Sequence, residues 1–276
     1  MAIDIFLRIY RMKTSLNQQF LILVLVTVTL ILLTSQSWAA VSTINPSADT
    51  FVTTGASGNL SGNNYGGAGA VSIAAPGLAQ GEFQSLLQFN LASTKSSFDS
   101  QFGAGQWHLL SISLQLTATS PNNAIFNSSA AGQFSLSWQQ NDGWTEGTGT
   151  PQAPTTSGLT FSTISNFVSG ADELLGTFSF AGGTSGTISY SLNLTPSFSA
   201  DVLAGNAVSL RGFAADSSVS YLADSRSFGT AAFRPVLNIS AIPEPNPALL
   251  GLLGLFLLRV FHPRRTRIYD GTPARN

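Results

Sequence analysis

The feature that most constrains the fold is an alternation of apolar and polar residues, repeated in many short stretches. The stretch QWHLLSISLQLTAT places Leu110, Ile112, Leu114 and Leu116 on one face and polar residues on the other. The stretches QFSLSW and TISYSLNL follow the same pattern. Because successive side chains of a β-strand point to opposite faces, each stretch predicts a strand that buries one face.

About ten such stretches lie between residues 41 and 241, separated by turn sequences such as NLSGNNYGGAG, SPNN and AGGTSG. We expect one helix, with Thr195 as its cap, Pro196 in its first position and Gly205 at its end. Strands with one apolar face must bury these faces against each other. The pattern therefore predicts an all-β fold, a single antiparallel β-sandwich of jelly-roll-like arrangement, with a closed barrel as the alternative.

The chain carries few charges, and they are unevenly distributed. Charged residues make up only 9% of the sequence, well below the roughly 25% of an average soluble protein, and there is no cysteine. Disulfides and cysteine-based chemistry are therefore ruled out. Residues 40–242 contain ten acidic and four basic residues, and the other eight basic residues lie in the two ends. A weakly acidic middle argues against nucleic acid as a partner, since nucleic-acid binding needs a basic surface.

The N-terminus has the three parts of a secretory signal peptide. Basic residues precede an apolar run over residues 20–33, and the tripeptide SWA supplies small residues three and one before a cut. We expect cleavage after Ala39, with Ala40 as the alternative position and a retained membrane anchor as the competing interpretation. The predicted division is then a signal peptide (1–39), a β-sandwich domain (40–241) and a C-terminal tail (242–276).

The predicted sandwich contains few groups suited to catalysis. The chain has two histidines, one of them in the tail, and no nucleophile-elbow pattern accompanies His108. Asp142 and Glu146 flank Trp144, as a sugar-cleaving carboxylate pair would beside an aromatic platform, but NDG is also a turn signal. Asp49 could share an oxygen-rich Ca²⁺ site with turn carbonyls, although capping a turn is the simpler role. We therefore expect neither an enzyme nor a cofactor.

Four pieces of the predicted sandwich resemble the DNRLRE-type β-sandwich domain of secreted bacterial proteins, which is related to a class of carbohydrate-binding modules. The pieces are PSADTFVTTG, LLQFNL, NDGWTEGTG and SRSFGTAAFRPVLNIS. The resemblance maps the family's recurring motifs onto Asp49, the run Trp144-Thr145-Glu146-Gly147 and the run Arg234-Pro235-Val236-Leu237. It implies an exported β-sandwich with a carbohydrate-binding relative.

The tail, PEPNPALLGLLGLFLLRVFHPRR, resembles the PEP-CTERM sorting signal. Such a signal joins a Pro-Glu-Pro motif, an apolar helix and a basic end. The corresponding residues here are Pro243, Glu244 and Pro245 for the motif and Arg264, Arg265 and Arg267 for the cytoplasmic basic cluster. The resemblance implies an exosortase-type processing enzyme and the inner membrane as transient partners, followed by delivery to the cell surface or the exopolysaccharide matrix.

The length of the tail agrees with a transient membrane stop. Its apolar run over residues 248–258 would form about 17 Å of helix, against a hydrocarbon core of about 30 Å. Basic residues beyond it would hold the end on the cytoplasmic side. A plain C-terminal anchor is the alternative.

Three functions follow from these features. The first is a non-enzymatic surface or extracellular-matrix protein, exported and sorted through its tail. The second is a carbohydrate-binding module that uses Trp107, Trp144 or Tyr65 as stacking surfaces. The third is a polysaccharide-degrading enzyme that uses Asp142 and Glu146. Exposure of two aromatic rings on one surface would favour the second function, and burial of both tryptophans would argue against it.

Overall fold

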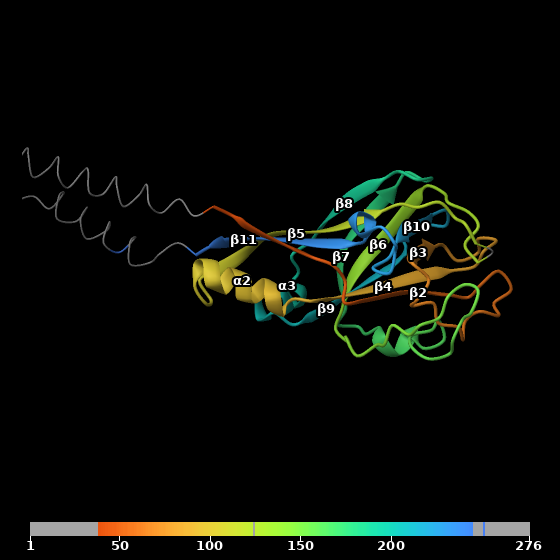
Figure 1. Cartoon of the computed structure of the whole chain (residues 1–276), viewed down its shortest axis with the longest axis horizontal. Coiled ribbons are helices and arrows are strands. Elements are labelled where there is room, and N and C mark those ends of the chain that lie inside the picture. Colours follow the sequence, from red (N-terminus) through yellow and green to blue (C-terminus); the bar gives the residue numbers. More distant parts are fainter. Residues whose placement is uncertain (1–37, 124, 245–250, 252–276) are drawn as a thin grey trace, which may run out of the picture.

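The strands form two antiparallel sheets that pack against each other (Figure 1). This computed structural model describes residues 38–123, 125–244 and 251. The smaller sheet has the order β1-β11-β5-β8. Its strands are β1 (Ala40–Ile44), β11 (Val236–Pro243), β5 (Trp107–Thr117) and β8 (Thr187–Leu192).

The larger sheet has the order β10-β3-β4-β9-β6-β7, and β2 also pairs with β4. Its strands are β2 (Ala48–Thr53), β3 (Ala70–Ala74), β4 (Phe83–Asn90), β6 (Gly132–Gln139), β7 (Glu173–Phe180), β9 (Ala207–Ala214) and β10 (Ser220–Asp224). The prediction of a β-sandwich is thus confirmed at the level of two packed antiparallel sheets.

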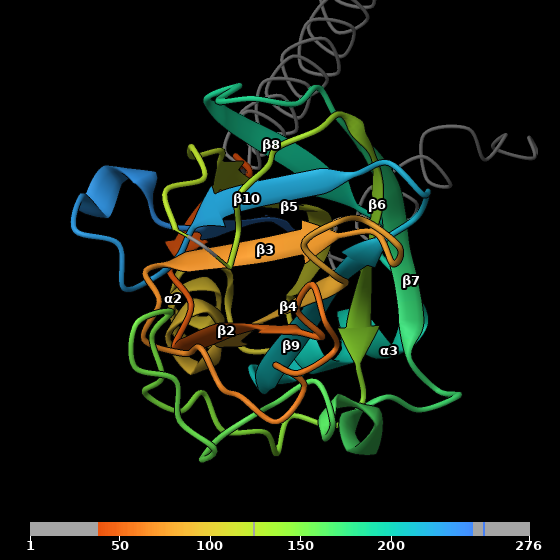
Figure 2. The same cartoon turned by 90° about the vertical axis from the view of Figure 1, so that its right-hand side faces the viewer.

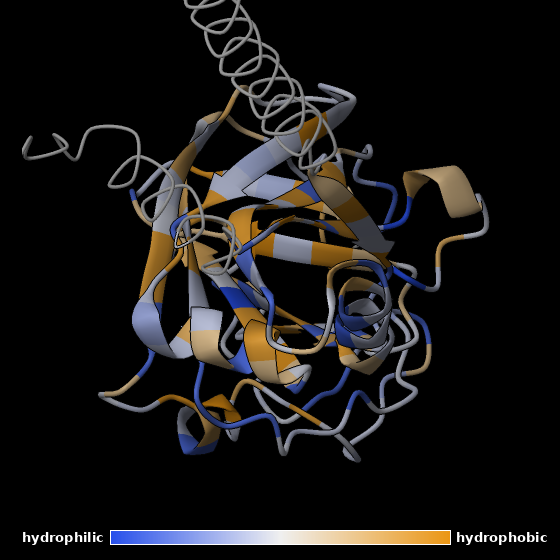
Figure 3. Ribbon diagram, turned by 90° about the vertical axis from the view of Figure 1, so that its left-hand side faces the viewer, coloured by the Kyte–Doolittle hydropathy of each residue, from blue (hydrophilic) through white to orange (hydrophobic). Residues whose placement is uncertain are grey.

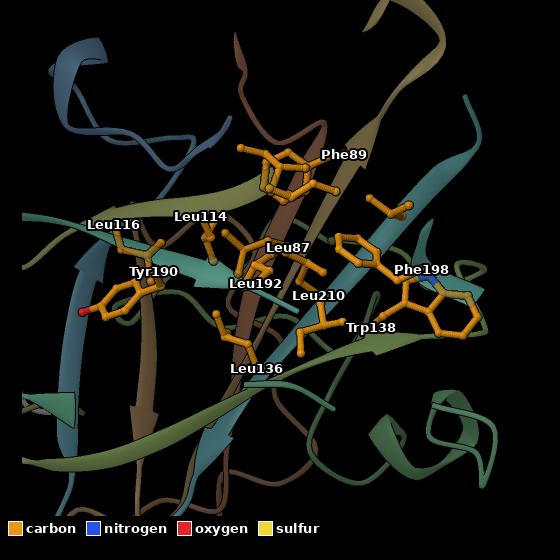
Figure 4. Packing of buried hydrophobic residues seen from close by; sticks show 14 of the residues in the cluster. Leu87, Phe89, Leu114, Leu116, Leu136, Trp138, Tyr190, Leu192, Phe198 and Leu210 are labelled. Atoms are coloured by element: carbon orange, nitrogen blue, oxygen red, sulfur yellow. The ribbon is translucent and has the colours of Figure 1, made fainter. Parts of the chain in front are cut away.

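The main core lies between the two sheets, where their apolar faces meet (Figure 4). Residues from both sheets contribute to it, among them Leu87, Leu114, Leu116, Leu136, Tyr190, Leu192 and Leu210. The predicted inward face of QFSLSW is confirmed, since Phe134, Leu136 and Trp138 are all buried. Alternation within the strands therefore decides which side chains form the core.

The predicted helix is present as α3 (Pro196–Ala204), and Gly205 ends it with φ of 73° in the left-handed region that favours glycine. Thr195 occupies the N-cap position as predicted, but its side chain makes no capping hydrogen bond to the helix. Glu173, at the start of β7, accepts hydrogen bonds from the backbone N–H groups of Ser197 and Phe198 instead. A remote carboxylate thus supplies the cap.

A second helix, α2 (Ala92–Phe102), was not expected from the sequence. Its segment, ASTKSSFDSQF, is rich in serine, a residue that favours caps and turns over helix interiors. Only Thr94 and Phe98 of this helix are buried. Packing of Phe98 into the main core, rather than intrinsic propensity, accounts for the helix. Two short 3₁₀ turns, η1 (Ile164–Phe167) and η2 (Ala231–Phe233), complete the regular structure of the described residues.

The predicted inward row of β5 is wrong at one position. Ile112, Leu114 and Leu116 are buried as expected, but Leu110 is 52% exposed. The register between β5 and β11 shifts between Ser240 and Ala241, so that Leu109 rather than Leu110 lies opposite Ala241. Such an irregularity places one extra residue in a strand and redirects the side chains beyond it.

No helix among the described residues is long and apolar enough to cross a membrane. The predicted signal peptide up to residue 37 lies outside the described residues, as do Pro245, Arg264, Arg265 and Arg267 of the tail.

Candidate functional site

The two ends of the described chain lie side by side in the smaller sheet. Strand β1 pairs antiparallel with β11, so that Ala40 lies opposite Ala241. Figure 1 shows the start of β1 and the end of β11 at the same end of the molecule, which Figure 3 views face on. The predicted signal-peptide cut and the start of the tail therefore lie next to each other.

The Pro-Glu-Pro motif begins inside the fold rather than after it. Strand β11 includes Pro243, two residues beyond the boundary predicted for the sandwich, and Pro243 lies opposite Trp107 of β5. The backbone N–H of Glu244 donates to the carbonyl oxygen of Gln106 at 2.8 Å. The side chain of Glu244 is exposed. The fold thus holds the first two motif residues in place at its edge.

Proline is tolerated at this position because of the way β1 ends. Strand β11 lies between β1 and β5, and a proline in a central strand would remove a hydrogen bond of the ladder. The pairing with β1 stops at Ala241, however, so that β11 is paired only with β5 at Pro243. Because no residue of β1 lies opposite Pro243, the missing N–H of the proline costs no hydrogen bond to β1.

The three aromatic residues predicted to contact sugar all lie inside the protein. Trp107, Trp144 and Tyr65 are 5%, 6% and 0% exposed. The Trp107 indole N–H donates to Asp99 at 2.8 Å, and the Trp144 indole N–H donates to the Ser209 hydroxyl at 2.8 Å. The prediction that these rings form a stacking platform is wrong, because none of them presents a face to solvent.

Tyr65 is held in place by a ring stack and a hydrogen bond. Its ring stacks on that of Phe51, with 4.9 Å between the centroids. The side-chain amide of Asn63 donates to its hydroxyl at 3.2 Å. Tyr65 thus belongs to a second, smaller core with Phe51, Phe83, Phe126 and Leu222.

Two of the residues mapped by the DNRLRE resemblance, Asp49 and Glu146, meet Arg226 in one polar cluster. The Arg226 guanidinium forms an ion pair with Glu146, and its Nε donates to Glu146 Oε1 at 2.6 Å. The Arg226 backbone N–H donates to Asp49 Oδ2 at 2.6 Å, and the Asp49 N–H donates to Glu146 Oε1 at 3.0 Å. The cluster therefore joins three of the four resembling pieces of the chain.

Burial dominates the electrostatics of this cluster. Asp49 is fully buried, and its Oδ1 has no hydrogen-bond partner. Burial raises the pKa of Asp49 to about 7, although the N–H of Arg226 opposes the rise. Nearby Glu146 raises this pKa further, since two negative charges repel.

Asn64 fastens the turn that carries Glu146. Its side-chain amide donates to the carbonyl oxygens of Glu146 and Leu159, at 2.6 and 2.8 Å, and its Oδ1 accepts from the N–H groups of Gly66 and Gly149. Figure 2 shows the two loops concerned running side by side, the orange one after β2 and the green one after β6. Every hydrogen-bonding atom of this buried side chain is used, which marks the turn as a structural joint.

Asp142 and Glu146 have different surroundings in the fold. Glu146 is held by Arg226. Burial raises the pKa of Asp142, against hydrogen bonding from Ser209. Among the described residues there is also no group of three or more His, Asp or Glu side chains that could hold a metal ion. His108 points away from the core and is exposed.

The outward face of the smaller sheet carries no charged side chain, and its middle is polar. Its four strands contain no Asp, Glu, Lys or Arg. One row across the sheet runs through Thr43, Asn238, Ser113 and Ser191, which lie opposite one another in successive strand pairs. Hydroxyl and amide groups of this kind can both donate and accept hydrogen bonds.

Asp49 and Glu146 were candidate residues in the sequence, whereas Arg226 and Asn64 were not. The charge imbalance could have indicated Arg226, because it is one of only four basic residues in the predicted sandwich. Nothing in the local sequence distinguishes Asn64 from the other asparagines of the loops. In comparisons with known proteins, no family model and no curated protein matches the chain.

Proposed function

We propose that this protein is a non-enzymatic, exported surface or extracellular-matrix protein that is sorted through its C-terminal tail. In this proposal a jelly-roll-like sandwich follows a cleaved signal peptide and precedes a Pro-Glu-Pro, apolar-helix and arginine signal. An exosortase-type enzyme and the inner membrane are its transient partners, and the cell surface or the exopolysaccharide matrix is its destination.

The observation that carries the proposal is the path of β11. The last strand of the sandwich leads directly into Pro243 and Glu244, and the N–H of Glu244 is still bonded to the fold. The Glu244 side chain is exposed, which suits access by a processing enzyme. This arrangement suits a sorting signal that must be accessible while its cargo is already folded.

Two further observations favour a role without catalysis. One of the two candidate carboxylates, Glu146, is held by Arg226 in a structural ion pair. The uncharged outward face of the smaller sheet offers hydroxyl and amide groups to a neutral, hydrated polysaccharide. We therefore place association with the polysaccharide on this face and not on the buried aromatic rings.

The test follows the tail in the native host, in a chain that carries an epitope tag after Asn276. We expect the wild-type protein to lose the tag and to reach the surface or matrix fraction. The variant Glu244→Ala should keep the tag and stay in the inner membrane. Asn246→Ala, which changes a residue just outside the motif, serves as the control and should be processed normally. A wild-type protein that keeps its tag would contradict the proposal.

A further inference from the structure

One end of the sandwich combines the first and last strands, β1 and β11, with exposed apolar side chains. We call it the terminal end, and it consists of the start of β1, the end of β11, the start of β5 and the turn over residues 103–106. Val41 is 63% exposed on β1, and Leu110 is 52% exposed on β5. Both side chains lie on strands that pair with β11. The bulge leaves the Leu110 side chain outside the core and exposed.

Charge at the terminal end is low. Lys95 and Asp99 of α2 form an ion pair with each other, and Asp99 also accepts from the Trp107 indole. The turn over residues 103–106 has the sequence GAGQ and carries no charge. Among the described residues of this end, Glu244 is the exposed carboxylate nearest the tail. A neutral surface with scattered apolar side chains can approach lipid headgroups at little desolvation cost.

Only a short length of chain connects the terminal end to the part of the tail that would enter a membrane. Pro243 is the last residue of β11, and the apolar run of the tail begins at Ala248. The five steps between them span at most about 17 Å when fully extended. The headgroup zone of one leaflet takes up roughly 5 to 7 Å of that length. The gap that remains is shorter than even the radius of gyration of a domain of this size, which is about 17 Å.

We infer that the terminal end rests on the membrane surface while the tail is in the bilayer, with Val41 and Leu110 in contact with the lipid headgroups. This inference rests on the proposed function, because it needs the tail to enter the membrane. The short tether prevents the sandwich from turning its other end toward the lipid. The loop over residues 145–160, at the opposite end in Figure 1, then points away from the membrane.

The experiment uses the chain from Ala40 to Asn276, without the predicted signal peptide, reconstituted into vesicles of phosphatidylethanolamine and phosphatidylglycerol. Because the chain has no cysteine, single variants Val41→Cys and Leu110→Cys can each carry one fluorescent label. Gln152→Cys, an exposed position in the loop at the opposite end, is the matched control. A nitroxide quencher attached to the lipid headgroups reports contact with the membrane surface. We expect quenching at positions 41 and 110 to be at least fivefold stronger than at position 152.

Flotation of the vesicles separates the two proposals. If the protein floats with the vesicles but the three labels are quenched equally, this inference is overturned. The claim that the tail anchors the protein in the membrane is then still supported. If the protein does not float, the tail does not anchor it, and both the tether and this inference fall. Circular dichroism of each variant checks the fold, which should be unchanged because all three positions are exposed.

Discussion

Arg226 joins segments of the chain that are far apart in sequence. Its guanidinium reaches Glu146, and its backbone N–H reaches Asp49, which is 177 residues away. The two carboxylates are poorly hydrated, since Asp49 is fully buried and the Glu146 side chain is only 15% exposed. Removal of the arginine would leave both without their cationic neighbour.

We therefore expect Arg226→Ala to lower the free energy of unfolding by about 2 kcal/mol, the size of a charged hydrogen-bonded contact. This figure is below that of a fully buried pair, because the Arg226 side chain is 37% exposed. Urea unfolding monitored by tryptophan fluorescence measures the change. The control is Arg234→Ala, which removes one hydrogen bond to the carbonyl of Phe228 and should cost about 1 kcal/mol. Equal losses in the two variants would contradict this account of the cluster.

Asp49 should also make stability depend on pH. Its pKa is raised to about 7 in the fold by burial, whereas an unfolded aspartate has a pKa of about 3.9. The folded state therefore binds more protons between pH 4 and pH 7, and the free energy of unfolding falls as pH rises through that window. Burial raises the pKa of Asp224 to about 6, which acts in the same direction.

For Asp49→Asn we expect a flatter profile, with a residual slope from Asp224. The wild-type protein should lose on the order of 3 kcal/mol more than the variant between pH 4 and pH 8. Urea unfolding of both proteins at several pH values measures this difference. Parallel profiles would show that Asp49 titrates normally in the fold.

At the scale of single elements, the strands follow from the sequence and the helices only in part. Strand β6 was predicted together with its inward face, because Phe134, Leu136 and Trp138 alternate without interruption. Helix α2 was missed, since it is stabilised by packing of Phe98 and not by its own sequence. The exposure of Leu110 could not be predicted either, because the bulge depends on the partner strand β11.

The cap of α3 supplies a prediction at this scale. Although partial burial opposes it, hydrogen bonds from Thr195, Phe198 and Ser197 lower the pKa of Glu173 to about 2. The stabilisation is therefore fully present above the unfolded pKa of about 4.3 and is lost as pH falls toward 2. Glu173→Ala should cost roughly 1 kcal/mol at pH 7, as for loss of a helix cap, and only a small fraction of that near pH 2.

Thermal or urea unfolding of the Glu173→Ala variant across this pH range measures the effect. Glu173→Gln keeps an acceptor without the charge, so its loss should be smaller and should change less with pH. A loss of the same size for Glu173→Ala at pH 2 and pH 7 would show that the carboxylate charge does not cap α3.

At the scale of the whole molecule, the topology places segments that are far apart in sequence next to each other. Ala40 and Ala241 lie opposite each other although they are about 200 residues apart. Such a pairing depends on the order of strands across both sheets, and no local pattern specifies it. The same holds for the candidate site, where the sequence indicated Asp49 and Glu146 but not their meeting at Arg226. Burial of Trp107 and Trp144 likewise follows from packing that a single sequence does not reveal.

The position of the motif at the edge of the fold also limits where the tail can be cut. Pro243 belongs to β11, and Glu244 is bonded to Gln106. A cut before Glu244 would require the end of β11 to open. We therefore expect processing after Glu244, which leaves the whole of β11 in the mature protein.

The most direct test of the sorting proposal is the intact mass of the protein recovered from its native host, measured separately in the membrane, surface and medium fractions. The account predicts a mass that corresponds to residues from Ala40 to about Pro245, found outside the inner membrane. A mass that still includes Arg264 and Arg265, found only in the membrane fraction, would contradict it and would leave a sandwich held by an ordinary C-terminal anchor.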